Sequence, residues 1–97
     1  MGSFADLRRR QRRLTILILL DACEGREASV DLIYRALPRE GLASSVDDIA
    51  ADLVWLADKE LVHTRDRDGI TFAHITPRGV DVAADRARVV GVERPGP

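Results

Sequence analysis

Apolar residues recur at helical spacing along the first quarter of the chain. One stripe at about 100° per residue consists of Phe4, Leu7, Leu14, Ile18 and Ala22. Ser3 with Asp6 three residues later is a helix start signal, and Gly25 fits a helix end, so we expect a helix from Phe4 to about Glu24. A second apolar set, on the opposite side of its later half, consists of Ile16, Leu19, Leu20 and Cys23. A helix that is apolar all round is buried all round, which predicts a central helix or one shared between two subunits of a homodimer through this second set.

Two shorter helical patterns follow. Ser29 can cap the first of them, and Pro38 ends it, because proline disfavours helix at the preceding residue and donates no backbone hydrogen bond. After the turn "PREGLASS", the serine pair at residues 44–45 can cap a third helix, within the stretch 44–61. We expect its inward face to be Val46, Ile49, Ala50, Leu53, Leu56 and Ala57.

The segment "LVHTRDRDGITFAHI" has the pattern of a β-hairpin. Two β-rich runs flank Asp68-Gly69, a pair that favours a two-residue turn. A turn at these two residues predicts a register of cross-strand pairs: Arg67 with Ile70, Arg65 with Phe72, and His63 with His74.

A last helix is expected after the hairpin, with Thr76 as its cap, Pro77 at its first position and its end near Arg88. Residues 91–97 contain too much glycine and proline for regular structure and are expected to form a tail on the surface or on a partner, outside a domain of residues 1–90. The order helix, helix, turn, helix, hairpin, helix predicts a mainly α fold with a small antiparallel β-hairpin, which is a winged helix-turn-helix.

Two segments carry a family resemblance. "ADLVWLADKELVHTR" resembles the passage from the third helix into the first wing strand of winged-helix proteins, and "HITPRGVDVAADRA" resembles the "L-T-x-x-G" entry to the helix after the wing, with Thr76 and Gly79 in matching places. The chain thus resembles the class that includes small bacterial repressors. It is also similar to small winged-helix, regulator-like proteins of Mu-like transposable phages and prophages, in "LRRRQRRLTILILL", "DLVWL" and "GVERPGP". This resemblance implies a phage origin and leads us to expect a regulatory, DNA-binding role.

Size and composition narrow the function classes. The 97 residues suffice for one domain, and 45% hydrophobic and 32% charged residues are ordinary for a globular chain. The longest apolar run, "ILILL", is far shorter than the roughly 20 residues of a membrane helix. The first residues do not follow the order of a secretory signal, and one cysteine permits no internal disulfide. We therefore expect a cytoplasmic protein, in the host cytoplasm if phage-encoded, without a membrane partner.

The net charge of −1 conceals a separation of sign. Residues 1–14 carry five arginines and one aspartate, whereas residues 44–60 carry five acidic side chains and one lysine. DNA affinity comes mainly from neutralising phosphates, so an acidic third helix is a poor reader of the major groove, and it has no arginine for guanine. A DNA-binding regulator of this sequence would have to use other residues.

The arginines outside the third helix are the candidate phosphate contacts of a dimeric regulator bound to double-stranded DNA. They are Arg8, Arg9, Arg12 and Arg13 in the first helix and Arg65 and Arg67 in the wing. A basic run binds DNA through charge without sequence preference. The same run could instead pair with the acidic face of the third helix, where an arginine over Trp55 would add a cation–π contact of roughly 0.5–2 kcal/mol. If the guanidinium groups are buried against the aspartates, the case for DNA loses its donors.

The third helix offers an alternative function, a protein-interaction module that serves phage assembly or host takeover and does not bind DNA. Its outward face is expected to include Asp48, Ala51, Asp52, Trp55 and Asp58. A tryptophan with a polar rim has the composition of an interface hot spot for a phage or host protein. The structural alternative is that the hairpin or the first helix covers this tryptophan.

Catalytic and metal-binding patterns are weak in this sequence. There is no glycine-rich phosphate loop, no serine elbow and no cysteine with an evident base, so we expect no enzyme and no cofactor. Cys23 is expected to be an inert packing residue. His63 and His74 face each other in the predicted hairpin, but two ligands without a third do not predict a metal site.

Overall fold

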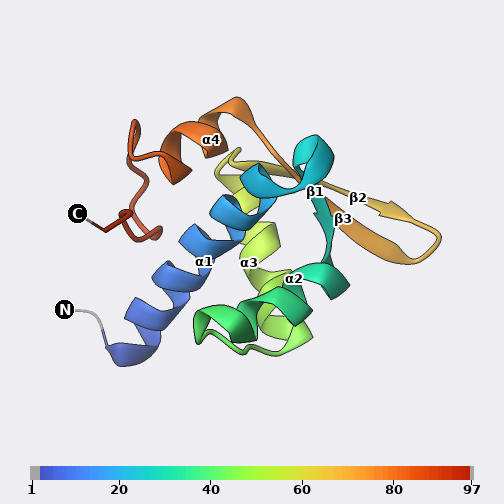
Figure 1. The fold of residues 1–97 in the computed structure, drawn as a ribbon, viewed down its shortest axis with the longest axis horizontal. Coiled ribbons are helices and arrows are strands. Elements are labelled where there is room, and N and C mark those ends of the chain that lie inside the picture. The colour runs from blue at the N-terminus through green and yellow to red at the C-terminus, as the bar shows by residue number, and fades with distance from the viewer. Residues whose placement is uncertain (1–2, 97) are drawn as a thin grey trace.

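The computed structural model describes residues 3–96 and contains helices packed around a small antiparallel sheet (Figure 1). The α-helices in this range are α1 (Phe4–Ala22), α2 (Val30–Ala36), α3 (Val46–Asp58) and α4 (Pro77–Ala83). The strands are β1 (Glu27–Ser29), β2 (Val62–Arg67) and β3 (Ile70–Ile75). Two short 3₁₀ helices, η1 (Glu24–Arg26) and η2 (Leu37–Glu40), follow α1 and α2. The predicted mainly α architecture with a small antiparallel sheet is confirmed, and it is compatible with a winged helix without being specific to one.

All four α-helices within residues 3–96 begin where the capping residues predict, and at α2 the Ser29 hydroxyl accepts from the Leu32 N–H. Ser3 and Asp6 form a reciprocal capping box at the start of α1, and the Ser45 hydroxyl accepts a hydrogen bond from a backbone N–H in the first turn of α3. At α4 the Thr76 hydroxyl accepts from the Gly79 N–H and donates to the Glu60 carbonyl. A Cβ on Gly79 would lie 2.2 Å from the carbonyl oxygen of Leu61, the residue before β2, so the helix can approach this backbone so closely only with glycine here.

The hairpin has the predicted register, with Arg67 opposite Ile70 and His63 opposite His74. The sequence did not predict β1, which pairs with β3 and gives the sheet the strand order β1-β3-β2. A three-residue strand is too short to show an alternating pattern, and it becomes a strand only through its partner. The hairpin extends beyond the helices as a two-stranded arm (Figure 1).

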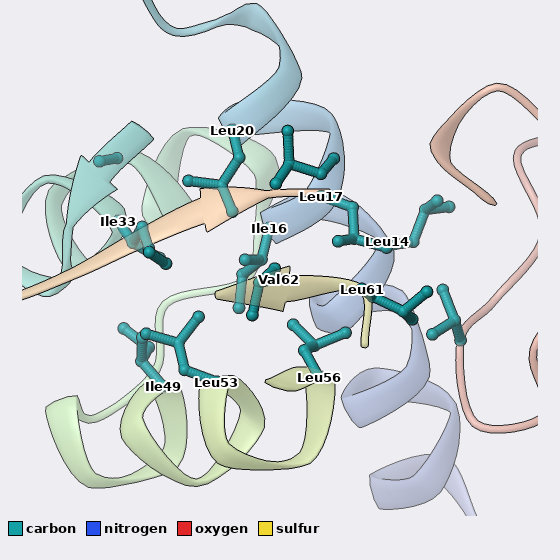
Figure 2. Packing of buried hydrophobic residues seen from close by; sticks show 14 of the residues in the cluster. Leu14, Ile16, Leu17, Leu20, Ile33, Ile49, Leu53, Leu56, Leu61 and Val62 are labelled. Carbon is teal, nitrogen blue, oxygen red and sulfur yellow. The ribbon is translucent and has the colours of Figure 1, made fainter. Parts of the chain in front are cut away.

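The core forms where α1 passes over the sheet and α3, as Figure 2 shows. From α1, Ile16, Leu17 and Leu20 are fully buried, and they pack with side chains of α3 and β2. The predicted central role of α1 is therefore correct. The expectation that α1 is buried on all sides is wrong, because Ile18 is 45% exposed.

The last helix ends earlier than predicted, at Ala83 rather than near Arg88, because Asp85 adopts a left-handed conformation with φ 63°. The following residues return along α1, and Val92 is buried in the same core as the helices. No helix within residues 3–96 is long and apolar enough to span a membrane.

Candidate functional site

An ion-pair cluster joins α1 to α3. Asp52, which is 2% exposed, accepts hydrogen bonds from the Nε groups of Arg12 and Arg13, the second at 3.0 Å. Arg12 also donates to the Ser44 hydroxyl at 3.3 Å. Within residues 3–96, no buried side-chain nitrogen or oxygen lacks a hydrogen-bond partner. The carboxylate therefore draws two arginines of the basic run into the interior, and we name Arg12, Arg13 and Asp52 the Arg–Asp cluster.

Trp55 lies next to this cluster and is only partly exposed. The Arg13 guanidinium stacks 4.0 Å from the ring centroid, and it donates a hydrogen bond to the Gly91 carbonyl at 3.1 Å. On another side, a Cβ on Gly91 would lie 2.5 Å from Cζ2 of the indole. The ring is thus enclosed by α1 and the C-terminal segment. The prediction of a cation–π contact over Trp55 is confirmed.

The C-terminal segment is fixed to α1 by further polar contacts. The Glu93 N–H donates to the Arg10 carbonyl at 3.2 Å, and the Arg10 Nε lies 3.3 Å from the Glu93 carboxylate. Arg94 donates two hydrogen bonds to Asp85, which, together with its charge, lower the pKa of that carboxyl below its ordinary value of 3.8. Residues 84–96 therefore pack back on α1, and Gly91 covers one side of the Arg–Asp cluster.

The remaining arginines of the N-terminal run are also engaged. Arg8 donates to the carbonyls of Gly41 and Ala43, at 3.3 and 2.6 Å, and so fixes the turn between η2 and α3. Arg9 pairs with Asp6 at 3.0 Å on the exposed start of α1. The predicted phosphate contacts Arg12 and Arg13 are wrong as free donors, because Asp52 holds both inside the fold.

The exposed face of α3 differs from the prediction. Asp48, Ala51 and Asp58 are exposed as expected, whereas Asp52 points inward and Trp55 lies on the flank toward α1. The physical reason is that two arginines of α1 supply the partners that a buried carboxylate needs. The solvent face is centred instead on Val54, which is 71% exposed.

This orientation of α3, with Asp52 inward and Val54 outward, also exposes apolar side chains that were expected to face inward. Val46 is 48% exposed and Ala50 is also exposed, so with Val54 they form a row at every fourth residue. A groove of about 370 Å³ lies between Val46 and Ala50 of this row and the hairpin tip, where Ile70 is 50% exposed. We name this surface the α3–hairpin face and define it as Val46, Asp47, Ala50, Val54, Asp58 and Ile70, with Asp31 of α2 at the edge of the groove.

The charge of the α3–hairpin face is acidic. Three aspartates of α3, Asp47, Asp48 and Asp58, are exposed, and the helix from Val46 to Asp58 contains no basic residue. In the adjoining hairpin, Arg65 pairs with Glu27 at 2.9 Å, and the Arg67 guanidinium lies 5.7 Å from the centroid of the Phe72 ring. The sequence contained a clue to the face, since Val54 lies on the row of Val46 and Ala50, opposite to the buried row of Ile49, Leu53 and Leu56.

The side chains that were assigned to a homodimer interface lie mostly in or against the core of the single chain. Ile16 and Leu20 are fully buried within the single chain, so their assignment to an intermolecular contact is wrong. Leu19 and Cys23 are half-buried and pack against the same core. The second apolar set of α1 therefore stabilises the fold of one chain, because the sheet and α3 cover it.

Metal ligands do not converge within the described part of the chain. Among residues 3–96, no group of three or more histidine, cysteine or acidic side chains is arranged to hold a metal ion. His63 and His74 are opposite each other in the sheet, and both are exposed.

Comparison with known proteins finds a relative in Escherichia phage Mu, which is described as uncharacterized protein gp26. It is 38% identical to this chain over 92 residues, which are 95% of this chain and 95% of the phage protein. This finding supports the predicted origin among Mu-like phages. No protein-family model matches the chain.

Proposed function

The chain belongs to the family of the phage Mu protein gp26, and for this member of the family we propose a winged-helix fold that serves as a protein-binding adaptor rather than an enzyme. The α3–hairpin face is the proposed binding surface. Its partner is a phage or host protein that presents basic residues around an apolar segment. This proposal keeps the protein-interaction hypothesis from the sequence and moves its centre from Trp55 to Val54.

The observation that supports this proposal is the distribution of charge around α3. A helix in this position of a winged helix meets the DNA major groove, where phosphates demand basic side chains. Here the exposed side chains of the helix are aspartates and small apolar residues. The Arg–Asp cluster holds Arg12 and Arg13 away from the surface, so the nearest basic run does not compensate for the aspartates.

The apolar part of the face supports protein binding directly. Val46, Val54 and Ile70 are each about half exposed or more. Val46 and Ile70 line the groove, and Val54 continues the row of Val46 and Ala50 one turn further along α3, so these side chains are not scattered singly. Apolar surface with a polar rim is the usual composition of a protein interface. An acidic rim selects a basic partner, because opposite charges raise the association rate and disfavour acidic competitors.

A dimeric DNA-binding regulator is the second candidate function. It is favoured by an element order that is compatible with a winged helix, and by Arg65 and Arg67 on the projecting hairpin. Binding of this kind would use the hairpin on phosphates or in a minor groove. It would leave α3 without a role in base recognition.

The test of the proposal uses one substitution at two exposed valines. Val54→Lys places a cation at the centre of the α3–hairpin face, and Val90→Lys makes the same change at a 98% exposed position outside it. Tagged chains are assayed against individually purified phage and host proteins. We expect Val54→Lys to abolish a pairwise complex that Val90→Lys preserves. A complex that survives Val54→Lys would contradict the assigned surface.

Binding to DNA is measured separately with a random-sequence duplex and with heparin over a salt gradient. We expect no complex with the duplex even at low salt. A duplex complex that Arg67→Ala weakens similarly on all sequences, with a smaller salt dependence, would overturn the adaptor proposal in favour of the regulator.

A further inference from the structure

Helix α1 retains an exposed apolar row on the side opposite to the core. Phe4 is 79% exposed, Leu7 40% and Ile18 45%. Gln11 and Thr15 lie between them at helical spacing, and the exposed Ala22 ends the row. We name this row the outer α1 row. It is apolar at both ends and polar in the middle.

The surface beside the outer α1 row is hollowed along η2. A groove of about 330 Å³ lies at the C-terminal end of the row, where Ile18, Ala22 and Ala36 contribute to its walls. A second groove, of about 270 Å³, lies beside Phe4 and Leu7 at the other end. Ala22 and Ala36 leave space at one end of the row, and the exposed Phe4 ring lies at the other.

We propose that a second copy of the chain docks on the outer α1 row, with the two α1 helices antiparallel. A two-fold axis close to residue 13 places Phe4 opposite Ala22 of the other copy, and Gln11 opposite Thr15. Each Phe4 ring then lies over the groove beside the partner's small alanines, and the polar pair meets at the centre. Such a row matches itself under a two-fold rotation, as an isologous interface requires. This inference does not rest on the proposed adaptor function.

Charge complementarity favours this occupant and this direction. Arg8 lies beside Phe4 and Leu7 of the row, and it is held by two backbone carbonyls rather than by a carboxylate. Its charge opposes the dipole of its own helix. In an antiparallel pair Arg8 comes opposite the partner's Ile18, toward the negative C-terminal end of the partner helix and beside the groove that Glu40 also lines. A parallel pair would instead place Arg8 of one copy beside Arg8 of the other, where the two charges repel.

Sedimentation equilibrium tests the association. We expect a dimer in the wild-type chain and an increase of at least about 30-fold in its dissociation constant for Ile18→Lys, the size of a hot-spot loss. Val90→Lys is the matched control and should remain dimeric. Val54→Lys should also remain dimeric, so a loss of the dimer can be told apart from a loss of partner binding at the α3–hairpin face. Circular dichroism verifies that each variant is folded. A wild-type chain that stays monomeric at all concentrations overturns the proposal.

Thiol crosslinking tests the direction in a Cys23→Ala background with a short bis-maleimide. A chain that carries both Gln11→Cys and Thr15→Cys should form covalent dimers, because these positions meet at the axis. Ala22→Cys alone should not, because 18 residues of helix at 1.5 Å each separate its two copies by roughly 27 Å. Covalent dimers of Ala22→Cys would overturn the antiparallel arrangement.

Discussion

Replacing Asp52 by alanine is the most direct test of how α1 is held on α3. The substitution removes the carboxylate that accepts from both Arg12 and Arg13. The Arg12 and Arg13 side chains are 9% and 12% exposed, so water does not replace the lost partner without opening the structure. Arg12 would retain the Ser44 hydroxyl, and Arg13 the Gly91 carbonyl. We therefore expect a large loss of stability.

The magnitude follows from the cost of an unpaired buried charge. Removing one partner of a buried ion pair costs about 3–5 kcal/mol of unfolding free energy. A domain of this kind has about 5–15 kcal/mol in total, so the variant should be marginally folded. At about 4–8 °C per kcal/mol for a domain of 60–100 residues, the midpoint of thermal unfolding should fall by roughly 12–40 °C.

Urea unfolding, followed by circular dichroism and by Trp55 fluorescence, measures the effect. Asp58→Ala removes an exposed aspartate of the same helix and should change the free energy of unfolding by no more than about 0.5 kcal/mol. Asp52→Asn keeps the shape and one acceptor but loses the charge, and it should fall between the two. A loss for Asp52→Ala of less than about 1 kcal/mol, well below the cost of breaking a buried pair, would refute the role assigned to the Arg–Asp cluster.

Two further predictions concern the C-terminal segment. Gly91→Ala should destabilise the fold by about 1–3 kcal/mol, because Gly91 has φ 105° and an added Cβ would meet the Trp55 ring. Gly96→Ala is the control and should be neutral in the same unfolding assay, because the space around Gly96 is open. The depressed pKa of Asp85 means that its pairing with Arg94 stabilises the fold above pH 3.8 and is lost as the pH falls from there through the folded-state pKa. An NMR titration of the Asp85 carboxyl should give a midpoint below 3.8, which Arg94→Ala should raise, and an unchanged midpoint would contradict the pairing.

Local features of the sequence predicted the elements well. Ser3 and Thr76 cap helices through contacts three residues away, and Asp68-Gly69 sets the hairpin register through its own turn. These features are read from neighbouring residues alone. Helix periodicity predicted that α1 is central, although it could not show that a row including Ile18 stays outside.

Apart from the end of α4, which a local turn at Asp85 sets, the main errors involve partners that are distant in the sequence. Asp52 was predicted to face solvent from its position around the helix, but its partners Arg12 and Arg13 are about 40 positions away in α1. The C-terminal segment was predicted to be a tail because of its glycines and prolines, yet Gly91 is the residue that lets the backbone pass against Trp55. Strand β1 has no pattern of its own and exists through its pairing with β3.

The arginine-rich start of α1 and the acidic third helix thus belong partly to one structural feature. Part of their opposite charge is paired inside the fold, where Arg12 and Arg13 of α1 contact Asp52 of α3 in the Arg–Asp cluster. The side chains that each helix leaves at the surface differ in chemistry. On α3 the remainder is acidic and apolar, so an architecture compatible with DNA reading presents a surface that phosphates repel. Because the side chains on a fold decide what it binds, the residues of the α3–hairpin face are better evidence of the partner than the order of helices and strands is. The two proposed surfaces are also separable, since Val54 and Ile18 lie on different helices and each can be altered without the other.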